Sequence, residues 1–213
     1  MLIYIVRHGE TNSNDEGRLQ GWSNDHLNDN GVKLALITGQ RMQNVKFDAC
    51  ISSPLNRARE TAEIILRESN NNIEIEYDNR IKEINMGDWE HKKIRPGECE
   101  IDEEVLKKFF YNPLTFPGCP NGENAEQVCN RTQEFLKELV SRDDNKTYLV
   151  VTHGCALRAM LNYLYDNPND FWQGHIPYNV SVSIVEGLGG EAKIIEHDKI
   201  YYDKSDAEDK YDM

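Results

Sequence analysis

The chain begins with a short apolar run, Met1 to Val6, that stops abruptly at Arg7-His8-Gly9. Such a run, rich in β-branched residues and followed by glycine and polar residues, predicts a buried strand that ends in a loop. In open α/β sheets, ligands bind at the carboxyl ends of the strands. A histidine at that place can act as a nucleophile, and the arginine beside it can bind an anion. The pair alone is a weak signal, because isolated short motifs are common.

A second apolar run, Tyr148 to Thr152, ends in the same way at His153-Gly154. Two histidines at the ends of two apolar strands can face each other if the strands are neighbours. The sequence therefore predicts one site that is built from distant parts of the chain.

The rest of the chain alternates between helical and strand-like patterns. Ser53 and Pro54 are expected to be the N-cap and first residue of a helix. The alternation predicts an α/β fold with three layers, α/β/α, around a mostly parallel central sheet. Helices are expected over 31–45, 54–67, 105–111, 123–141 and 156–165, and strands over 47–51, 73–77, 148–152, 180–185 and 192–196.

The length of 213 residues fits one domain with an insertion. Two Pro-containing turns and a short amphipathic piece break the rhythm over 91–122, which we interpret as that insertion. The last residues, from about 203, are polar and acidic and are expected to form a mobile tail.

The formal net charge is −13, which argues against nonspecific binding to nucleic acid. An anionic substrate would have to be attracted by a local arginine cluster against this field. The five cysteines are odd in number and irregularly spaced, and no apolar run reaches the length of a membrane span. We therefore expect a cytoplasmic protein without a membrane partner, and we expect no metal and no cofactor. The oligomeric state cannot be predicted.

Four segments together resemble one family. They are 7–22, with Arg7-His8-Gly9-Glu10-Thr11 and Gly17-Arg18-Leu19-Gln20-Gly21-Trp22; 52–62, with Ser-Ser-Pro and Arg57; 81–90, with Glu83 before Gly-Asp-Trp-Glu; and 150–154, with His153-Gly154. This pattern resembles the histidine phosphatase superfamily, also called the phosphoglycerate mutase-like family, and in particular its small bacterial-type phosphatases. A fifth segment, 177–182, is similar to a late strand of that family. The resemblance implies the phosphoglycerate mutase-like fold.

The resemblance also implies roles for individual residues. His8 would be the nucleophile that becomes phosphorylated, and Glu83 would protonate the leaving alkoxide. Arg7, Arg57 and His153 would hold the phosphoryl group, and further substrate contacts would come from Asn14, Gln20, Gly21 and Gly154. One departure is His91, which stands where the family usually has glycine after Trp-Glu.

The expected function is hydrolysis of a small phosphorylated metabolite through a phosphohistidine, without a metal. The main alternative is a cofactor-dependent phosphoglycerate mutase, which typically holds a substrate carboxylate with paired arginines and lysines. No Arg-Arg pair occurs and 98–104 is acidic, although Lys92, Lys93 and Arg95 could partly substitute. A non-catalytic phosphoester-binding module is a second alternative, and it would be expected to lack His8, Glu83 or Arg57.

The aromatic residues of the insertion have two open interpretations. Phe109, Phe110, Tyr111 and Phe116 could line the mouth of the substrate site, or they could pack the insertion onto the body of the protein. The substrate itself cannot be predicted from the sequence.

Overall fold

Within residues 1–206, which the computed structural model describes, six strands form one sheet in the order β3-β2-β4-β1-β5-β6. The strands are Leu2–Arg7 (β1), Ala49–Ser52 (β2), Ile75–Tyr77 (β3), Thr147–Thr152 (β4), Val182–Leu188 (β5) and Glu191–Lys199 (β6). The pairs β3–β2, β2–β4 and β4–β1 are parallel, whereas β5 runs antiparallel to both of its neighbours. The expected mostly parallel sheet is confirmed, with β3 at one edge and a tight turn at Gly189 and Gly190 between β5 and β6.

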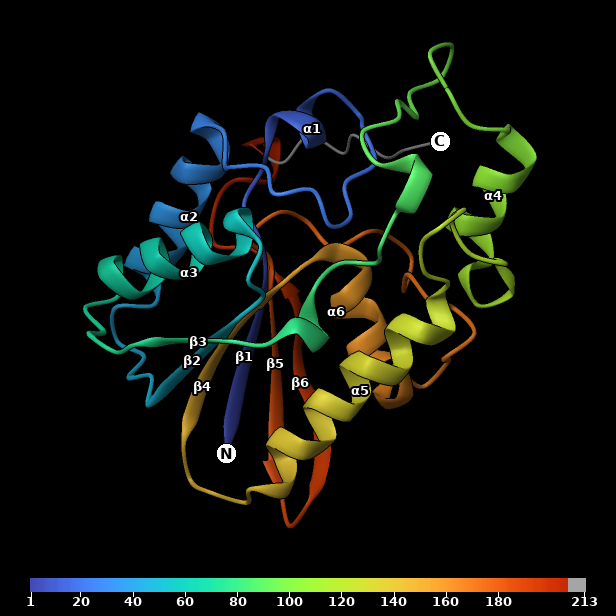
Figure 1. Ribbon diagram of the computed structural model, residues 1–213. Coiled ribbons are helices and arrows are strands. Elements are labelled where there is room, and N and C mark those ends of the chain that lie inside the picture. Colours follow the sequence, from blue (N-terminus) through green and yellow to red (C-terminus); the bar gives the residue numbers. More distant parts are fainter. Residues whose placement is uncertain (207–213) are drawn as a thin grey trace.

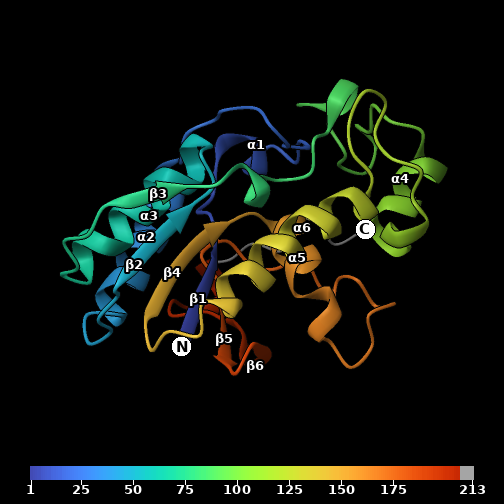
Figure 2. The same cartoon turned by 60° about the horizontal axis from the view of Figure 1, so that its bottom comes forward.

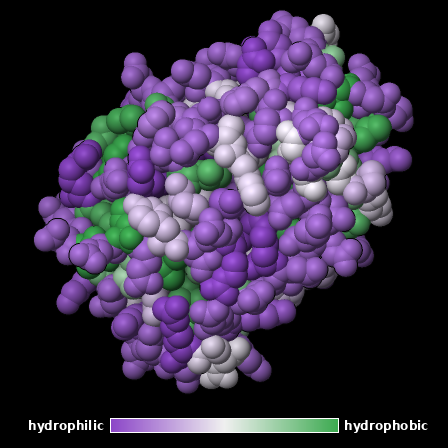
Figure 3. Space-filling model, in the orientation of Figure 1, coloured by the Kyte–Doolittle hydropathy of each residue, from purple (hydrophilic) through white to green (hydrophobic). Residues whose placement is uncertain are grey.

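Helices cover both faces of this sheet (Figures 1 and 2). Helices α2 (Asp29–Arg41) and α3 (Asn56–Glu68) lie on one face, and α5 (Ala125–Ser141) and α6 (Gly154–Leu161) lie on the other. The expected three layers are therefore confirmed. The face of the molecule in Figure 3 is mostly hydrophilic, and its apolar areas are small and separate, in keeping with 29% charged residues.

The alternation of side chains along β1 explains how one strand serves both layers. Ile3 and Ile5 pack into the core beneath α5 and α6, whereas Val6 packs beneath α2 and α3. Successive side chains of a strand point to opposite faces, so a fully apolar strand is what a sheet covered on both sides requires. Strand β4 does the same, with Val150 on one face and Val151 on the other.

Strands β1 and β4 end side by side. Arg7 pairs in register with Thr152, so the residues that follow, His8 and His153, leave the sheet at the same edge. The two strands are therefore neighbours, which is the condition under which the two histidines can face each other.

The start of α3 differs from the sequence-based expectation. The helix begins at Asn56, and Leu55 is its N-cap residue with no side-chain cap bond, so Ser53 does not cap it. Instead, the Ser53 hydroxyl lies 2.7 Å from His153 Nε2. The same hydroxyl also accepts from the N–H of Leu55 at 3.4 Å, so it serves the turn before the helix as well as the contact with His153. Arg57 still lies in the first turn of α3.

The segment predicted as an insertion contains α4 (Glu103–Tyr111) and a short 3₁₀ turn, Pro113–Thr115. Phe109 and Phe116 are buried in a cluster with Trp89 and residues of α5 and α6, so α4 packs beside these two helices (Figure 1). The single-domain division and the insertion stay predictions. Most of the expected acidic tail lies outside the described residues, which end at 206 with a 3₁₀ turn, Lys204–Asp206. None of the helices in the described part of the chain has the length and apolar character needed to cross a membrane.

Candidate active site

His8 follows β1 and is buried. Its Nδ1 lies 2.6 Å from the carbonyl oxygen of Gly9. A carbonyl can only accept, so Nδ1 carries the proton, and the electron pair of Nε2 accepts a hydrogen bond from Arg57 Nε. Burial lowers the pKa of His8 well below its ordinary value of 6.5, and the positive charges of Arg57 and Arg7 lower it further. The ring is therefore neutral, with its nucleophilic nitrogen defined by one backbone contact.

His153 ends β4 directly beside it. The ring centroids of His8 and His153 are 5.1 Å apart. His153 Nε2 contacts the Ser53 hydroxyl, whereas its Nδ1 is buried without a hydrogen-bond partner. Burial is the main reason that the pKa of His153 lies well below 6.5. A buried nitrogen without a partner is costly, and a bound phosphoryl oxygen would satisfy it.

Arg57, in the first turn of α3, is held in place by two backbone carbonyls. Its Nη1 donates to Ser23 and its Nη2 to Gly21, each at 2.7 Å, while Nε donates to His8 Nε2 at 3.3 Å. Burial lowers the pKa of this guanidinium to about 10, so it remains charged near neutral pH. The fixed fork thus places a positive charge directly against the candidate nucleophile.

Arg7 is the second buried cation of the site. One of its terminal nitrogens donates to the carbonyl of Pro177, and its Nε is buried with no partner. A Cβ added to Gly154 would lie 3.4 Å from this Nε, so the glycine leaves room beside the guanidinium. Arg7 Nε and His153 Nδ1 are thus two buried nitrogens that could each donate to an oxygen of an anion.

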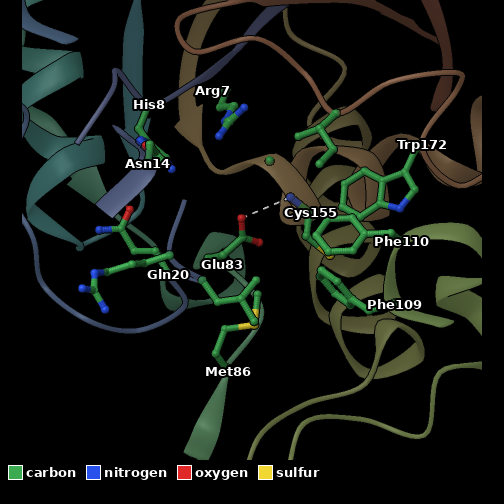
Figure 4. A pocket seen from close by; sticks show the side chains of 14 residues that line it. Arg7, His8, Asn14, Gln20, Glu83, Met86, Phe109, Phe110, Cys155 and Trp172 are labelled. Carbon is green, nitrogen blue, oxygen red and sulfur yellow. Dashed lines mark hydrogen bonds between the residues drawn. The ribbon is translucent and has the colours of Figure 1, made fainter. Parts of the chain in front are cut away.

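Glu83 lies between two 3₁₀ turns, Asn79–Ile81 and Gly87–Trp89, in a segment without regular structure. Its carboxyl group accepts from the backbone N–H groups of Cys155 at 3.1 Å and Ala156 at 3.0 Å, in the first turn of α6 (Figure 4). Burial raises the pKa of Glu83 above its ordinary value of 4.5, and these N–H groups and Arg57 oppose that rise. A carboxyl with a raised pKa can hold a proton for a leaving group.

A pocket of about 470 Å³ opens in front of these residues. Figure 4 shows Glu83 near its centre, with Arg7 and His8 on one side and aromatic side chains on the other. Arg57 and His153 contact His8 but are not among the residues that line the pocket. The residues that line it are Arg7, His8, Asn14, Arg18, Leu19, Gln20, Glu83, Met86, Phe109, Phe110, Gly154, Cys155, Trp172 and Ile176.

The four further predicted contact residues divide into two groups. Asn14, Gln20 and Gly154 line the pocket, whereas Gly21 does not. The Gly21 carbonyl accepts from Arg57, and its N–H donates to the Glu90 carboxylate at 3.1 Å. A Cβ at this glycine would lie 2.5 Å from the carbonyl oxygen of Ile84, so the chain is too close there for any side chain.

One wall of the pocket is apolar. It is formed by Phe109 and Phe110 of α4 together with Trp172 and Ile176, which belong to the loop after α6. Phe109 contacts both Phe110 and Trp172 edge to face, at centroid distances of 5.0 and 6.0 Å. Both interpretations of the aromatic group thus hold in part: Phe109 and Phe110 line the mouth, Phe116 packs in the core, and Tyr111 is exposed.

Several residues of this site have no recognisable signal in the sequence. Ser53 was assigned to a helix cap, and Trp172 and Ile176 lie in a segment without a motif. Their roles depend on contacts across the fold, which no local spacing records. Among the described residues, no group of three or more His, Cys, Asp and Glu side chains is arranged to hold a metal ion.

The comparisons with known proteins agree with this geometry. The family model described as "Histidine phosphatase superfamily (branch 1)" matches residues 3–199. A curated relative, the Erwinia tasmaniensis "Probable phosphoglycerate mutase GpmB", is 31% identical over 186 residues, which cover 87% of this chain and 85% of that protein.

Two solved structures have the same fold. Bacillus stearothermophilus YhfR is 32% identical, with a TM-score of 0.83 over 93% of this chain and 97% of that one. A phosphoserine phosphatase of Entamoeba histolytica, in complex with phosphoserine, is 25% identical, with a TM-score of 0.76 over 92% of this chain and 95% of that one. Fold and family together define the class, which is that of the phosphatases. The chain belongs to the histidine phosphatase superfamily.

Proposed function

We propose that this protein hydrolyses small phosphomonoesters through a phosphohistidine intermediate on His8, without a metal. The observation that carries the proposal is the arrangement of His8: one ring nitrogen is bound to the Gly9 carbonyl and the other lies next to Arg57. A neutral, oriented imidazole beside two buried arginines is what attack on a phosphoryl group requires.

In the first step, the hydrogen bond from Arg57 Nε to His8 Nε2 breaks, Nε2 attacks the phosphorus atom, and the bond to the substrate alkoxide breaks. Arg7, Arg57 and His153 stabilise the charge on the transferring oxygens, and Glu83 donates its proton to the departing alkoxide. Charge stabilisation by groups that are already in place is usually the largest contribution to such a reaction. The two unpartnered nitrogens of Arg7 and His153 support this role.

In the second step, water attacks the phosphohistidine. Glu83, now a carboxylate, accepts a proton from that water, the N–P bond breaks, and neutral His8 and inorganic phosphate are released. The same carboxyl group acts first as acid and then as base, which restores the starting state.

The wall of the pocket favours hydrolysis over mutase activity. A mutase has to hold the carboxylate of its substrate, and Arg7 and Arg18 are the cations among the pocket-lining residues. Arg7 belongs to the proposed phosphate site. Arg18 is already bound to the Glu16 carboxylate at 2.5 Å and to the His91 carbonyl at 2.9 Å. The aromatic wall supports an alcohol part without a carboxylate.

Phosphate release from an aryl phosphate, without added metal, tests the proposal. We expect His8→Ala to lower the rate by at least about 1,000-fold, because removal of a covalent nucleophile abolishes the route rather than one contact. Rapid quenching of the wild type should trap one acid-labile phosphoryl group per chain. His26→Ala, at an exposed histidine paired with Glu60, is the matched control and should keep full activity. Equal rates for wild type and His8→Ala would instead indicate the non-catalytic binding module.

Phosphoglycerate mutase activity is the second candidate, since curated relatives carry that name. A panel of phosphomonoesters that includes 3-phosphoglycerate with a bisphosphoglycerate separates the two. Net isomerisation without phosphate release would replace the phosphatase proposal by the mutase.

We also propose a reducing, cytoplasmic environment. The support is that all five cysteines lie in the described part of the chain and are free thiols.

A further inference from the structure

The proposed acid Glu83 has no secondary structure of its own to hold it. It lies in the irregular stretch between two 3₁₀ turns, yet its carboxyl group meets the N–H groups of Cys155 and Ala156 at the start of α6. An irregular segment keeps such an alignment only if other groups satisfy and fix its backbone. The question is which side chains do so.

Arg131 of α5 binds the backbone on the N-terminal side of the acid. Its Nη1 donates to the carbonyls of Arg80 at 2.8 Å and Lys82 at 2.6 Å, and its Nη2 donates to the carbonyl of Glu83 itself at 2.8 Å. One guanidinium thus binds three backbone carbonyls of the segment.

Glu123 binds the backbone on the C-terminal side. Its Oε2 accepts from the N–H of Asn85 at 2.8 Å, and its own N–H donates to the Asn85 carbonyl at 2.9 Å. Asn85, two residues after Glu83, is therefore held at both its backbone N–H and its carbonyl group.

The two side chains are joined to each other by a bidentate ion pair. Arg131 Nε lies 2.9 Å from Glu123 Oε1, and Nη2 lies 2.8 Å from Oε2. The side chains are both 17% exposed, so the pair is largely shielded from solvent. With these contacts all five N–H donors of Arg131 are used.

Neither side chain lines the pocket, where the substrate would bind. Their contacts to the general-acid segment are made to its backbone N–H and carbonyl groups. A lysine could not replace the arginine, because a compact ammonium cannot reach three carbonyls and a carboxylate in one plane.

We propose that the Arg131–Glu123 pair positions the general acid: it holds the backbone of residues 80–85 so that the Glu83 carboxyl group lies against the start of α6 and faces the leaving alcohol. Arg131 and Glu123 are thus positioning residues for proton donation, with no contact to the substrate. This inference rests on the proposed function, since it presupposes that Glu83 is the acid.

The dependence of kcat/KM on the leaving group tests the inference. An alcohol of low pKa, such as nitrophenol, leaves without a proton, whereas a simple alkyl alcohol needs one. We expect Arg131→Lys and Glu123→Gln to hydrolyse nitrophenyl phosphate within about threefold of the wild-type kcat/KM, and an alkyl phosphate at least about tenfold more slowly, since general acid catalysis is worth about 10²–10⁴-fold. A merely structural role would lower both substrates by the same factor.

Arg80→Gln is the matched control. The Arg80 side chain also joins the acid's segment to α5, through Glu138 at 2.6 Å, but its side chain does not bind the backbone next to Glu83. It should leave the leaving-group dependence unchanged. Thermal unfolding of each variant shows whether it is folded. If Arg131→Lys does not fold, Glu123→Gln, which keeps the size of the side chain, tests the inference alone.

Glu83→Gln separates the role of Glu83 as the acid from the positioning role of Arg131 and Glu123. If it steepens the leaving-group dependence and the two positioning variants do not, the positioning inference is wrong and the proposed acid stands. If Glu83→Gln leaves the dependence unchanged, the assignment of the acid itself fails.

Discussion

The Nε atom of Arg57 donates to His8 Nε2 across 3.3 Å, so the nitrogen proposed to attack phosphorus is already in contact with a cation. Both side chains are buried, and the guanidinium is fixed from behind by the carbonyls of Gly21 and Ser23. The arginine therefore keeps the imidazole neutral and oriented before the substrate arrives. When a phosphoryl group enters, the same donor lies beside the oxygens that gain charge.

Arg57→Lys should lower kcat/KM for a phosphomonoester by about 10²–10³-fold, the usual effect of losing one donor to a developing oxyanion. Lysine keeps a charge but cannot span two carbonyls and the imidazole together. Steady-state kinetics with an aryl phosphate measure the effect. Arg59→Lys on the same helix, where the arginine is exposed and paired with Glu63, is the control and should match the wild type. Near-normal activity of Arg57→Lys would show that the fork geometry is unimportant.

The pH profile of kcat/KM for an alkyl phosphate, whose leaving group needs a proton, should be bell-shaped. Catalysis needs neutral His8 and protonated Glu83, and at their ordinary pKa values of 6.5 and 4.5 these two forms would hardly coexist. Burial lowers the pKa of His8 and raises that of Glu83, which moves both in the direction that lets the active form predominate. The rate should rise with pH through the lowered pKa of His8 and fall through the raised pKa of Glu83. Glu83→Gln should abolish the fall on the alkaline side, and a fall that persists in this variant would contradict the assignment.

Ser53→Ala should lower kcat by about 3–10-fold, since one neutral hydrogen bond is worth about 0.5–1.5 kcal/mol. The hydroxyl lies 2.7 Å from His153 Nε2. If the hydroxyl donates to Nε2, the ring carries its own proton on Nδ1, which is the buried nitrogen without a partner. Single-turnover kinetics measure the step directly. Ser23→Ala is a suitable control, because that hydroxyl is buried near the site without a partner. An unchanged rate in Ser53→Ala would mean that His153 needs no orienting partner.

Arg158→Met should destabilise the fold by about 3–5 kcal/mol, because it removes the permanently charged partner of a buried carboxylate and leaves only the more distant His175 and His197 rings, at 3.5 and 3.6 Å. Arg158 of α6 is fully buried and binds the Asp198 carboxylate, and it also donates to His197 Nε2 at 2.7 Å and to the His175 carbonyl at 2.9 Å. Urea unfolding gives the difference in free energy. Arg59→Met, at a single partly exposed pair with Glu63, should cost at most about 1 kcal/mol. Equal losses of unfolding free energy in the two variants would contradict the expectation that the buried arginine contributes more than the partly exposed one.

The strand ends could be predicted from the sequence because their signals are local. The β-branched runs before His8 and His153 define two buried strands, and buried parallel strands bring their carboxyl ends to one edge. Arg57 followed from its place three residues after Pro54. The positions of these side chains relative to one another, given by the register of Arg7 with Thr152, needed the structure.

Other features could not be predicted, because they depend on contacts between distant segments. From the sequence, the Ser53 hydroxyl could cap a helix or bind a distant side chain. Its contact with His153 depends on the approach of β4. Trp172 lies 62 residues after Phe110 in the sequence, yet both line one wall of the pocket. Glu123 lies eight residues before Arg131 and outside α5, and the three backbone acceptors of Arg131 lie about fifty residues earlier still, so no local spacing indicates these contacts.

The apolar wall has a consequence for how such a chain can diversify. Phe109, Phe110, Trp172 and Ile176 come from two segments that interrupt the alternation of strands and helices, whereas the reactive groups are fixed at the ends of β1 and β4 and at the start of α3. Substitutions in those two segments reshape the space for the alcohol while the reacting atoms keep their places. Exchange of these two segments thus changes which phosphoester fits the pocket, while the reacting residues stay the same.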